Sequence, residues 1–258
     1  MMDLTLTTAG FLVGLLVGFT GVGGGALMTP FLIYYGLAPA VAVGTDLVYA
    51  AITKTGGLVL HHRRGTVHWR IVGLLALGSL PAAVLSITLL RQLAESGVNY
   101  ESLITSTLGI SLVLTSLFLL FRSTNSDSGP VVASSQVKIP CRVGICTVVG
   151  GALLGVLVTL SSVGAGALGA AMLMLVYPRL RTVNVVGIDI AHAALLTAAS
   201  GFGHVQLGTV DFTLLWHLLL GSIPGIALGT RLGIKLPELF VRRALGALLL
   251  SVGVSFSI

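Results

Sequence analysis

Apolar residues run along almost the whole chain, in stretches separated by short polar segments. A stretch of about 20 apolar residues crosses the hydrocarbon core of a bilayer as an α-helix. Full crossings are predicted near residues 41–60, 70–90, 102–121, 183–202, 212–232 and 240–257. The pattern therefore predicts an all-α polytopic membrane protein, which we expect in the cell (inner) membrane.

Two further apolar segments, residues 4–35 and 142–178, are too long for a single crossing. A continuous helix of about 35 residues would be roughly 50 Å long, well beyond the thickness of the hydrocarbon core. Each segment contains a glycine-rich interruption near its middle, at residues 20–25 and 161–166. Each is therefore predicted to form a broken, re-entrant helical hairpin that returns to the side from which it entered.

The chain also contains an internal repeat. Gly44-Thr45-Asp46 recurs as Gly187-Ile188-Asp189, 143 positions later, and the same offset relates Gly-Ser-Leu-Pro at 78–81 to Gly-Ser-Ile-Pro at 221–224. The glycine cluster at 21–27 has a counterpart 141 positions later. The matches keep their order along the chain, which indicates a duplication. The predicted division is a first repeat over 1–121, a linker over 122–140 and a second repeat over 141–258.

The distribution of lysine and arginine sets the expected orientation. Most of them lie in 61–70, in the linker, in 179–181 and in 231–243, and the positive-inside rule assigns these segments to the cytoplasm. Both termini then lie outside. Matching segments of the two halves face opposite sides, which predicts inverted repeats, each with one broken hairpin and three transmembrane helices. Inverted repeats with discontinuous helices are typical of secondary transporters.

Composition excludes other classes of protein. Only 9% of the 258 residues are charged and 55% are hydrophobic, too little charge for a water-facing surface. The net charge of +6 is spread over short loops, so we expect no nucleic-acid partner. Cys141 and Cys146 form no metal-ligand pattern, and neither a metal nor another cofactor is expected.

The stretch from Gly21 to Ala26 satisfies the G-x-G-x-x-(G/A) pattern of a dinucleotide-binding loop. That pattern is meaningful only between a strand and a helix, and here both flanks are apolar helical segments. The glycines could instead allow tight helix packing. We favour a third interpretation, because two half-helices that begin after Gly25 and near Gly166 would point their N-terminal N–H groups at the membrane midplane. Helix N-termini bind anions.

The predicted substrate-binding residues lie in the two interruptions, supply hydroxyl donors beside them or, in the case of Lys54, share a helix face with Asp46. They are Thr20, Gly21, Gly23, Gly24, Gly25, Ser161, Ser162, Gly164, Ala165, Gly166, Thr45 and Lys54.

Ionisable residues inside membrane segments are costly and are functional candidates by default. Asp46, Asp189 and His192 are predicted either to couple transport to protons or to stabilise the unwound loops. The alternatives are helix caps for the aspartates and a packing role for His192. Lys54 shares a helix face with Asp46 and would either attract the anion or extend toward the cytoplasmic surface. His68 and the other histidines at 61, 62 and 204 are expected to lie in loops and be solvated.

The motif GxGGGALMTPFLI near the N-terminus, the VGTD that follows it and the repeated GS(L/I)P together resemble the TauE/SafE-type sulfite exporter family. The resemblance covers essentially the whole chain. It implies an integral membrane carrier for sulfite, organosulfonates or related anions. We therefore predict a secondary transporter that exports a small sulfur-containing anion, with the lipid bilayer and that anion as partners. Proton coupling and a homo-oligomer are left open.

Two other functions are considered. An anion channel is the first, because broken helices also build selectivity filters. An intramembrane hydrolase is the second, with Ser200 next to Gly201 and either His204 or His192 as its base, although Ala198 stands where such enzymes have a glycine.

Overall fold

The computed structural model describes residues 2–20, 25–121, 139–233 and 238–257. Within these ranges the chain forms ten α-helices and no strand. The helices are α1 (Met2–Thr20), α2 (Gly25–Tyr34), α3 (Pro39–Arg63), α4 (Trp69–Glu95), α5 (Glu101–Phe121), α6 (Cys141–Ser161), α7 (Ala167–Val176), α8 (Thr182–Gln206), α9 (Phe212–Gly233) and α10 (Glu238–Ser257). The all-α prediction is confirmed, and every predicted crossing coincides with one helix.

Membrane-spanning character is clear from the helices themselves. Five of them, α4, α5, α6, α8 and α9, are long and apolar enough to cross a bilayer, and α2 and α7 are shorter apolar helices. The 25-residue helix α3 is not among the five, because it carries Asp46, Lys54 and a basic C-terminal end. The protein is therefore a helical membrane protein in which one central helix is unusually polar.

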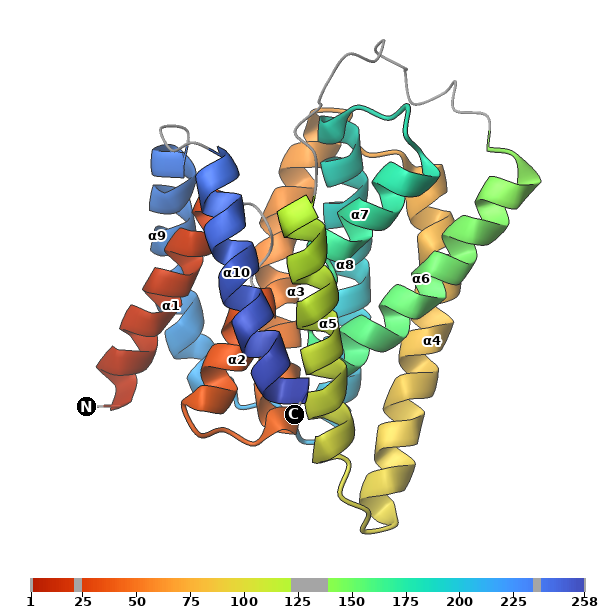
Figure 1. Cartoon of the computed structure of the whole chain (residues 1–258). Coiled ribbons are helices and arrows are strands. Elements are labelled where there is room, and N and C mark those ends of the chain that lie inside the picture. Colours follow the sequence, from red (N-terminus) through yellow and green to blue (C-terminus); the bar gives the residue numbers. More distant parts are fainter. Residues whose placement is uncertain (1, 21–24, 122–138, 234–237, 258) are drawn as a thin grey trace.

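The two broken segments run as hairpins. In Figure 1, α1 rises from the N-terminus and α2 descends again, while α6 descends from the opposite end of the bundle and α7 returns to it. The short helices α2 and α7 have 10 residues each, so each spans about 15 Å, half of a hydrocarbon core. Their N-terminal ends consequently lie inside the bundle.

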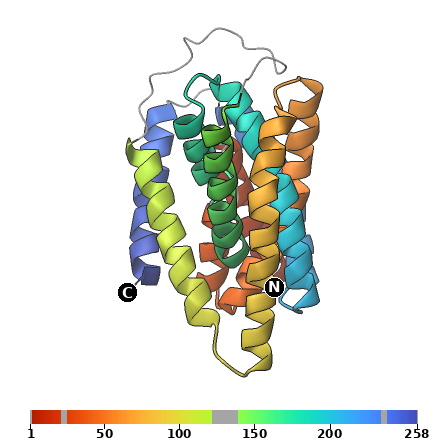
Figure 2. The ribbon, with the colours of Figure 1, turned by 90° about the vertical axis from the view of Figure 1, so that its right-hand side faces the viewer.

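Helix packing pairs elements from different halves of the chain. The most extensive pairings are α1 with α9, α4 with α6, α5 with α10 and α3 with α8. These pairs follow the repeat. If each helix from α1 to α5 is replaced by its counterpart five helices later, and the reverse, the pair α1–α9 becomes α6–α4, while α5–α10 and α3–α8 stay the same. Figure 2, turned by 90° from Figure 1, shows α4 alongside α6 and α8. The two halves of the chain are thus interlocked through these helix pairs.

Individual contacts also match between the halves. Gly14 of α1 packs so closely on α9 that an added Cβ would lie 2.7 Å from the Cα atom of Ser222. Gly155 of α6 packs in the same way on α4, where the corresponding distance to the Cα atom of Ser79 is 2.8 Å. Glycine is required at both positions because neighbouring backbone would collide with any side chain. These contacts support the inverted repeat, which remains a prediction.

The ends of α3 and α8 carry a second matched feature. The Nδ1 atom of His61 lies 2.8 Å from Oγ1 of Thr66, and Nδ1 of His204 lies 2.8 Å from Oγ1 of Thr209. Each threonine hydroxyl also donates to the backbone carbonyl of its histidine, at 3.0 and 3.1 Å. Both turns are therefore closed by the same hydrogen bonds.

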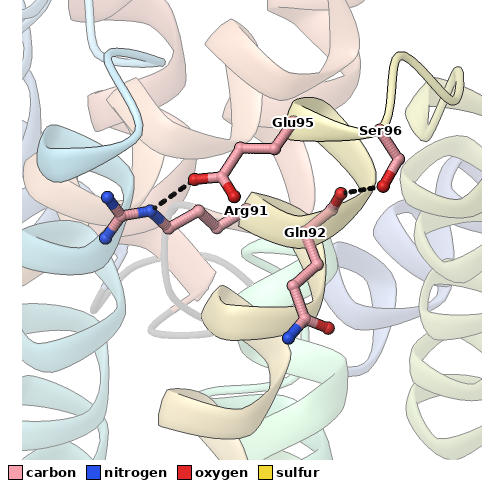
Figure 3. Close-up of polar contacts among 4 residues, drawn as sticks. All are labelled: Arg91, Gln92, Glu95 and Ser96. Atoms are coloured by element: carbon pink, nitrogen blue, oxygen red, sulfur yellow. Dashed lines mark hydrogen bonds and ion pairs between the residues drawn. The ribbon is translucent and has the colours of Figure 1, made fainter.

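The far end of α4 is polar and exposed. Figure 3 shows the ion pair between Arg91 Nε and Glu95 Oε1, at 3.0 Å, and the hydroxyl of Ser96 donating to the carbonyl of Gln92. Both charged side chains are about two-thirds exposed. An exposed ion pair of this kind contributes about 0–1 kcal/mol to stability, so it has little effect on where the C-terminal end of α4 lies.

Candidate functional site

The interruption between α6 and α7 is held in an unusual backbone conformation. Ser162 has φ +58°, the one positive φ outside glycine within the described ranges, and its N–H donates to the carbonyl of Val158 at 2.8 Å. Gly164 and Gly166 have φ of +114° and +147°, and Gly166 caps the start of α7. These conformations favour glycine, which explains why this part of the predicted site is built from glycines.

The two interruptions meet inside the bundle. A Cβ added to Gly25, the first residue of α2, would lie 3.1 Å from the carbonyl carbon and 3.2 Å from Oγ of Ser162. Ala26 and Val163 belong to the same buried apolar cluster. The start of the first half-helix thus rests against the end of α6. Gly21, Gly23 and Gly24 lie outside the described residues, and Thr20 is the last residue of α1.

Asp46 lies at this junction. Its side chain is fully buried, and its Oδ2 atom accepts a hydrogen bond from the hydroxyl of Thr29 at 2.5 Å. Ser162 lies beside the same carboxylate. Asp46 is seven residues into α3, which begins at Pro39 and has Ala38 at its N-cap, so the helix-cap alternative is wrong.

Lys54 connects α3 with the second interruption. Its ammonium group donates to the backbone carbonyl of Ala165, at 2.5 Å, and interacts electrostatically with Asp189 and Asp46. Lys54 therefore interacts with both carboxylates while it is bonded to the second interruption. The alternative in which Lys54 extends toward the membrane surface is wrong, because the ammonium binds a carbonyl within the bundle.

Asp189 is the second buried carboxylate that interacts with this lysine. The carboxylate is about 5% exposed, and its Oδ1 atom lies directly against Gly169 of α7. Asp189 is seven residues into α8, whose N-cap is Arg181, so it is not a helix cap either. One turn later, His192 is about 1% exposed and its Nε2 atom lies 2.8 Å from the hydroxyl of Ser79 in α4.

Several buried polar atoms around this centre have no hydrogen-bond partner in the part of the chain that the structure describes. They are Oδ1 of Asp46, Oδ1 of Asp189, Oγ of Ser162, the hydroxyl of Tyr49 and Oγ of Ser222. Unsatisfied buried polar atoms are rare in native proteins and each needs an explanation. Those of Ser162, Asp46 and Asp189 lie beside the first turns of α2 and α7, which marks this region as the candidate site.

Two predicted residues point elsewhere. The hydroxyl of Thr45 accepts a hydrogen bond from the backbone N–H of Asp211, at 3.0 Å, and so secures the connection between α8 and α9. The hydroxyl of Ser161 donates to the carbonyl of Leu157 at 2.6 Å and accepts from the N–H of Val163. Both hydroxyls are fully buried and already bonded to backbone.

Sequence reasoning missed Thr29 and Ser79 as members of the site. Ser79 belongs to the repeated Gly-Ser-Leu-Pro motif, so the repeat itself was the available signal. Nothing in the local sequence distinguishes Thr29 from a packing residue. Both become visible only through their partners, Asp46 on α3 and His192 on α8.

The prediction that His68 and His204 are solvated is wrong. His204 is buried within α8 and its Nε2 atom lies 3.0 Å from the carbonyl of Thr159. His68, at the N-cap of α4, is about 3% exposed and lies 3.3 Å from the side-chain amide of Asn184. Burial lowers the pKa of His68 from its usual value near 6.5. The His68 ring thus contacts the second half of the chain, while the His204 ring joins α8 to α6 within that half.

The geometry gives no support to a hydrolase. Oγ of Ser200 lies 2.8 Å from the hydroxyl of Thr159, while the ring nitrogens of His204 lie against Thr209 and the Thr159 carbonyl. The serine–base hydrogen bond expected of a nucleophilic site is therefore replaced by other contacts.

Comparison with known proteins agrees with this architecture. Residues 6–256 match the model of the family described as "Sulfite exporter TauE/SafE". The chain is 38% identical over 231 residues to the "Probable membrane transporter protein YjnA" of Bacillus subtilis (strain 168), covering 90% of each chain. It is 25% identical to YdhB of the same organism, named in the same way, over 91% of this chain and 92% of the relative. A relative from Xylella fastidiosa (strain Temecula1 / ATCC 700964), also named as a probable membrane transporter protein, is 25% identical over 95% of this chain. No solved structure matches the chain.

The broken hairpins, the polar helix α3 and a family match over nearly all of the sequence lead to one conclusion: the chain belongs to the TauE/SafE sulfite exporter family of membrane transporters.

Proposed function

We propose that the protein is a secondary transporter of the cell (inner) membrane that exports a small sulfur-containing anion, such as sulfite or an organosulfonate. The observation that carries this proposal is the meeting of the two interruptions at Gly25 and Ser162, with the ammonium of Lys54 bonded to the Ala165 carbonyl in the second interruption. Positive charge and backbone N–H groups inside a membrane protein are costly unless a ligand or a counter-charge uses them.

The half-helices α2 and α7 would supply the field that attracts an anion. Each helix start carries about half a positive charge from its unpaired N–H groups. The sequence adds Gly21, Gly23 and Gly24 before α2, and Gly164, Ala165 and Gly166 before α7. The Ser162 hydroxyl, which has no partner within the described ranges, would be a further donor.

Lys54 would provide the full positive charge. A sulfonate or sulfite carries several oxygen acceptors around one sulfur atom, which suits a site with converging donors from two helix starts and one ammonium. Charge-assisted hydrogen bonds contribute about 1.5–3 kcal/mol each. A few such bonds would give micromolar to millimolar binding after desolvation, and weak binding suits a carrier because it must release its substrate.

Reconstitution into proteoliposomes tests the proposal. Protein vesicles and protein-free vesicles would be loaded with methanesulfonate or, at pH 8, with sulfite, and efflux would be measured at increasing concentration. Saturable efflux that requires the protein is the expected result for a carrier. Efflux that rises linearly with concentration, with a current proportional to voltage, would identify a channel. Absence of flux for both anions would refute the substrate class.

A further inference from the structure

The charged groups at the centre of the bundle do not balance. Two buried carboxylates, Asp46 and Asp189, both interact electrostatically with one ammonium, that of Lys54. With all three groups ionised the cluster carries a net charge of −1. A monovalent anion would then enter a site that repels it, because charges in a low-dielectric interior interact strongly.

A proton removes this conflict. We propose that Asp189 binds one proton whenever the anion binds, so that anion and proton cross the membrane together. This inference rests on the transport function and the anion class proposed above, and it specifies the coupling. Because the cytoplasm is the more alkaline side, the pH difference then drives the anion inward, and net export requires an outward gradient of the anion that exceeds the pH difference. With Asp189 neutral, Lys54 and Asp46 balance each other and the helix starts can hold the anion. For a monovalent anion the translocation step moves no net charge.

The hydrogen bonds distinguish the two carboxylates. Oδ2 of Asp46 accepts a hydrogen bond from the hydroxyl of Thr29 at 2.5 Å, and such a donor stabilises an ionised carboxylate. In both carboxylates Oδ1 has no hydrogen-bond partner among the described residues, and at Asp189 this atom lies against Gly169. The Thr29 bond to Oδ2 therefore distinguishes Asp46 from Asp189. Ala170 stands where the repeat would place the counterpart of Thr29, so no hydroxyl is available there. Burial without donors favours the neutral acid, which makes Asp189 the proton carrier.

The surroundings of Asp189 leave few other candidates. Helix α3 contributes Lys54 and, beyond it, Asp46. Helix α8 itself contributes His192, which is bonded to Ser79 of α4 and lies near the Lys54 ammonium, so a second positive charge there would be repelled.

The remaining packed elements add no titratable group at this depth. Helix α7 carries no ionisable side chain. The ionisable side chains of α6 lie in its first turns, at Cys141, Arg142 and Cys146. The ionisable side chains of α4 lie near its ends, at Arg70, Arg91 and Glu95.

The cycle balances without any further reactant. A proton from water on one side adds to an Asp189 oxygen, and the anion binds at the helix starts and Lys54. After access changes to the other side, the anion leaves and the O–H bond of the carboxylic acid breaks, returning the proton to water. One proton and one anion move per cycle.

Methanesulfonate is the appropriate probe, because it keeps its single negative charge at every pH used. Vesicles with a pH difference of one unit and the potential clamped to zero are expected to accumulate it up to about tenfold on the alkaline side. A potential without a pH difference is expected to drive no accumulation. A pH indicator inside the vesicles should report one proton for each methanesulfonate.

Variants then assign the carrier. Asp189→Asn should retain exchange of labelled for unlabelled methanesulfonate but lose the pH-driven accumulation. Glu95→Gln, which changes an exposed carboxylate at the end of α4, is the matched control and should behave as the unmodified protein.

Each result has one consequence. Accumulation driven by the potential alone, or no proton movement with methanesulfonate in the unmodified protein, would overturn the coupling while leaving the transport function intact. Coupling that survives in Asp189→Asn would overturn the choice of Asp189. If Asp189→Asn does not fold, the proton count on the unmodified protein still decides the coupling. No flux or exchange of methanesulfonate or sulfite would instead refute the proposed function.

Discussion

Close glycine contacts between the halves allow a sharp test of how the helices pack. Gly78 of α4 faces α6, where an added Cβ would lie 2.8 Å from the backbone nitrogen of Ala152 and closer still to the carbonyl of Val148. Backbone atoms in a helix cannot move aside as a flexible side chain can. Gly78→Ala must therefore push α4 away from α6, and overpacking of this kind costs about 1–3 kcal/mol.

Gly73, one and a half turns earlier on the same helix, provides the matched control. An added Cβ there meets nothing within 4 Å, so Gly73→Ala is expected to be neutral or to stabilise α4 by about 0.5–1 kcal/mol. For a protein of this size about 1 kcal/mol corresponds to 2–4 °C in melting temperature. Gly78→Ala should thus melt about 2–12 °C below the unmodified protein, and Gly73→Ala should not.

The measurement is the apparent melting temperature in detergent micelles, followed as the loss of the monodisperse peak in gel filtration after heating. Gly221→Ala tests the same packing on the other side of the repeat. A Cβ added at Gly221 of α9 would lie 2.8 Å from the backbone nitrogen of Phe11 in α1. The repeat predicts a similar decrease for this variant. Equal stability of Gly78→Ala and Gly73→Ala would refute the packing argument, and widely different effects at Gly78 and Gly221 would contradict the repeat.

Three further predictions concern transport and orientation. Lys54→Met keeps roughly the length of the side chain and removes its charge. Loss of one charge-assisted contact, about 1.5–3 kcal/mol, should raise the KM for methanesulfonate about 10-fold to 150-fold. An unchanged KM would show that Lys54 does not bind the anion. Gly24→Leu should abolish flux while leaving folded protein in the membrane, and wild-type flux would favour the packing interpretation of the glycines. Ser126→Cys on a cysteine-free background should resist an impermeant thiol reagent in intact cells, because the linker is predicted to be cytoplasmic, and ready labelling would reverse the orientation.

The positions of the helices could be predicted from the sequence because bilayer thickness limits them. The interruption predicted at 161–166 coincides with the end of α6 at Ser161 and the start of α7 at Ala167. The crossing predicted at 102–121 is α5, Glu101–Phe121. Glycine clusters and apolar run lengths are local signals, and local signals are sufficient to locate helix ends.

Side-chain partners could not be predicted in the same way, because they depend on which helices become neighbours. Thr45 and Asp46 are adjacent in sequence, yet one bonds the connection after α8 and the other bonds Thr29 of α2. His204 looked like a loop residue, but α8 extends to Gln206 and buries the ring against Thr159. Each outcome follows from a contact between distant segments that no short pattern encodes.

Interlocking of the halves limits how access to the site can change. The hairpin helix α1 is held against α9, and α6 against α4, through glycines at backbone distance, and such contacts leave no room for sliding. Each hairpin should therefore move together with the helix of the opposite repeat on which it is packed. The contact between Gly25 and Ser162 joins the start of α2 to the end of α6, so it lies between the two moving units. A motion that separates the units would open the site at this contact, beside Asp46 and Lys54. In this arrangement the residues that attract the anion also become exposed to water when the units separate. Anion binding can therefore favour one conformation and so be coupled to the change in which side of the membrane reaches the site.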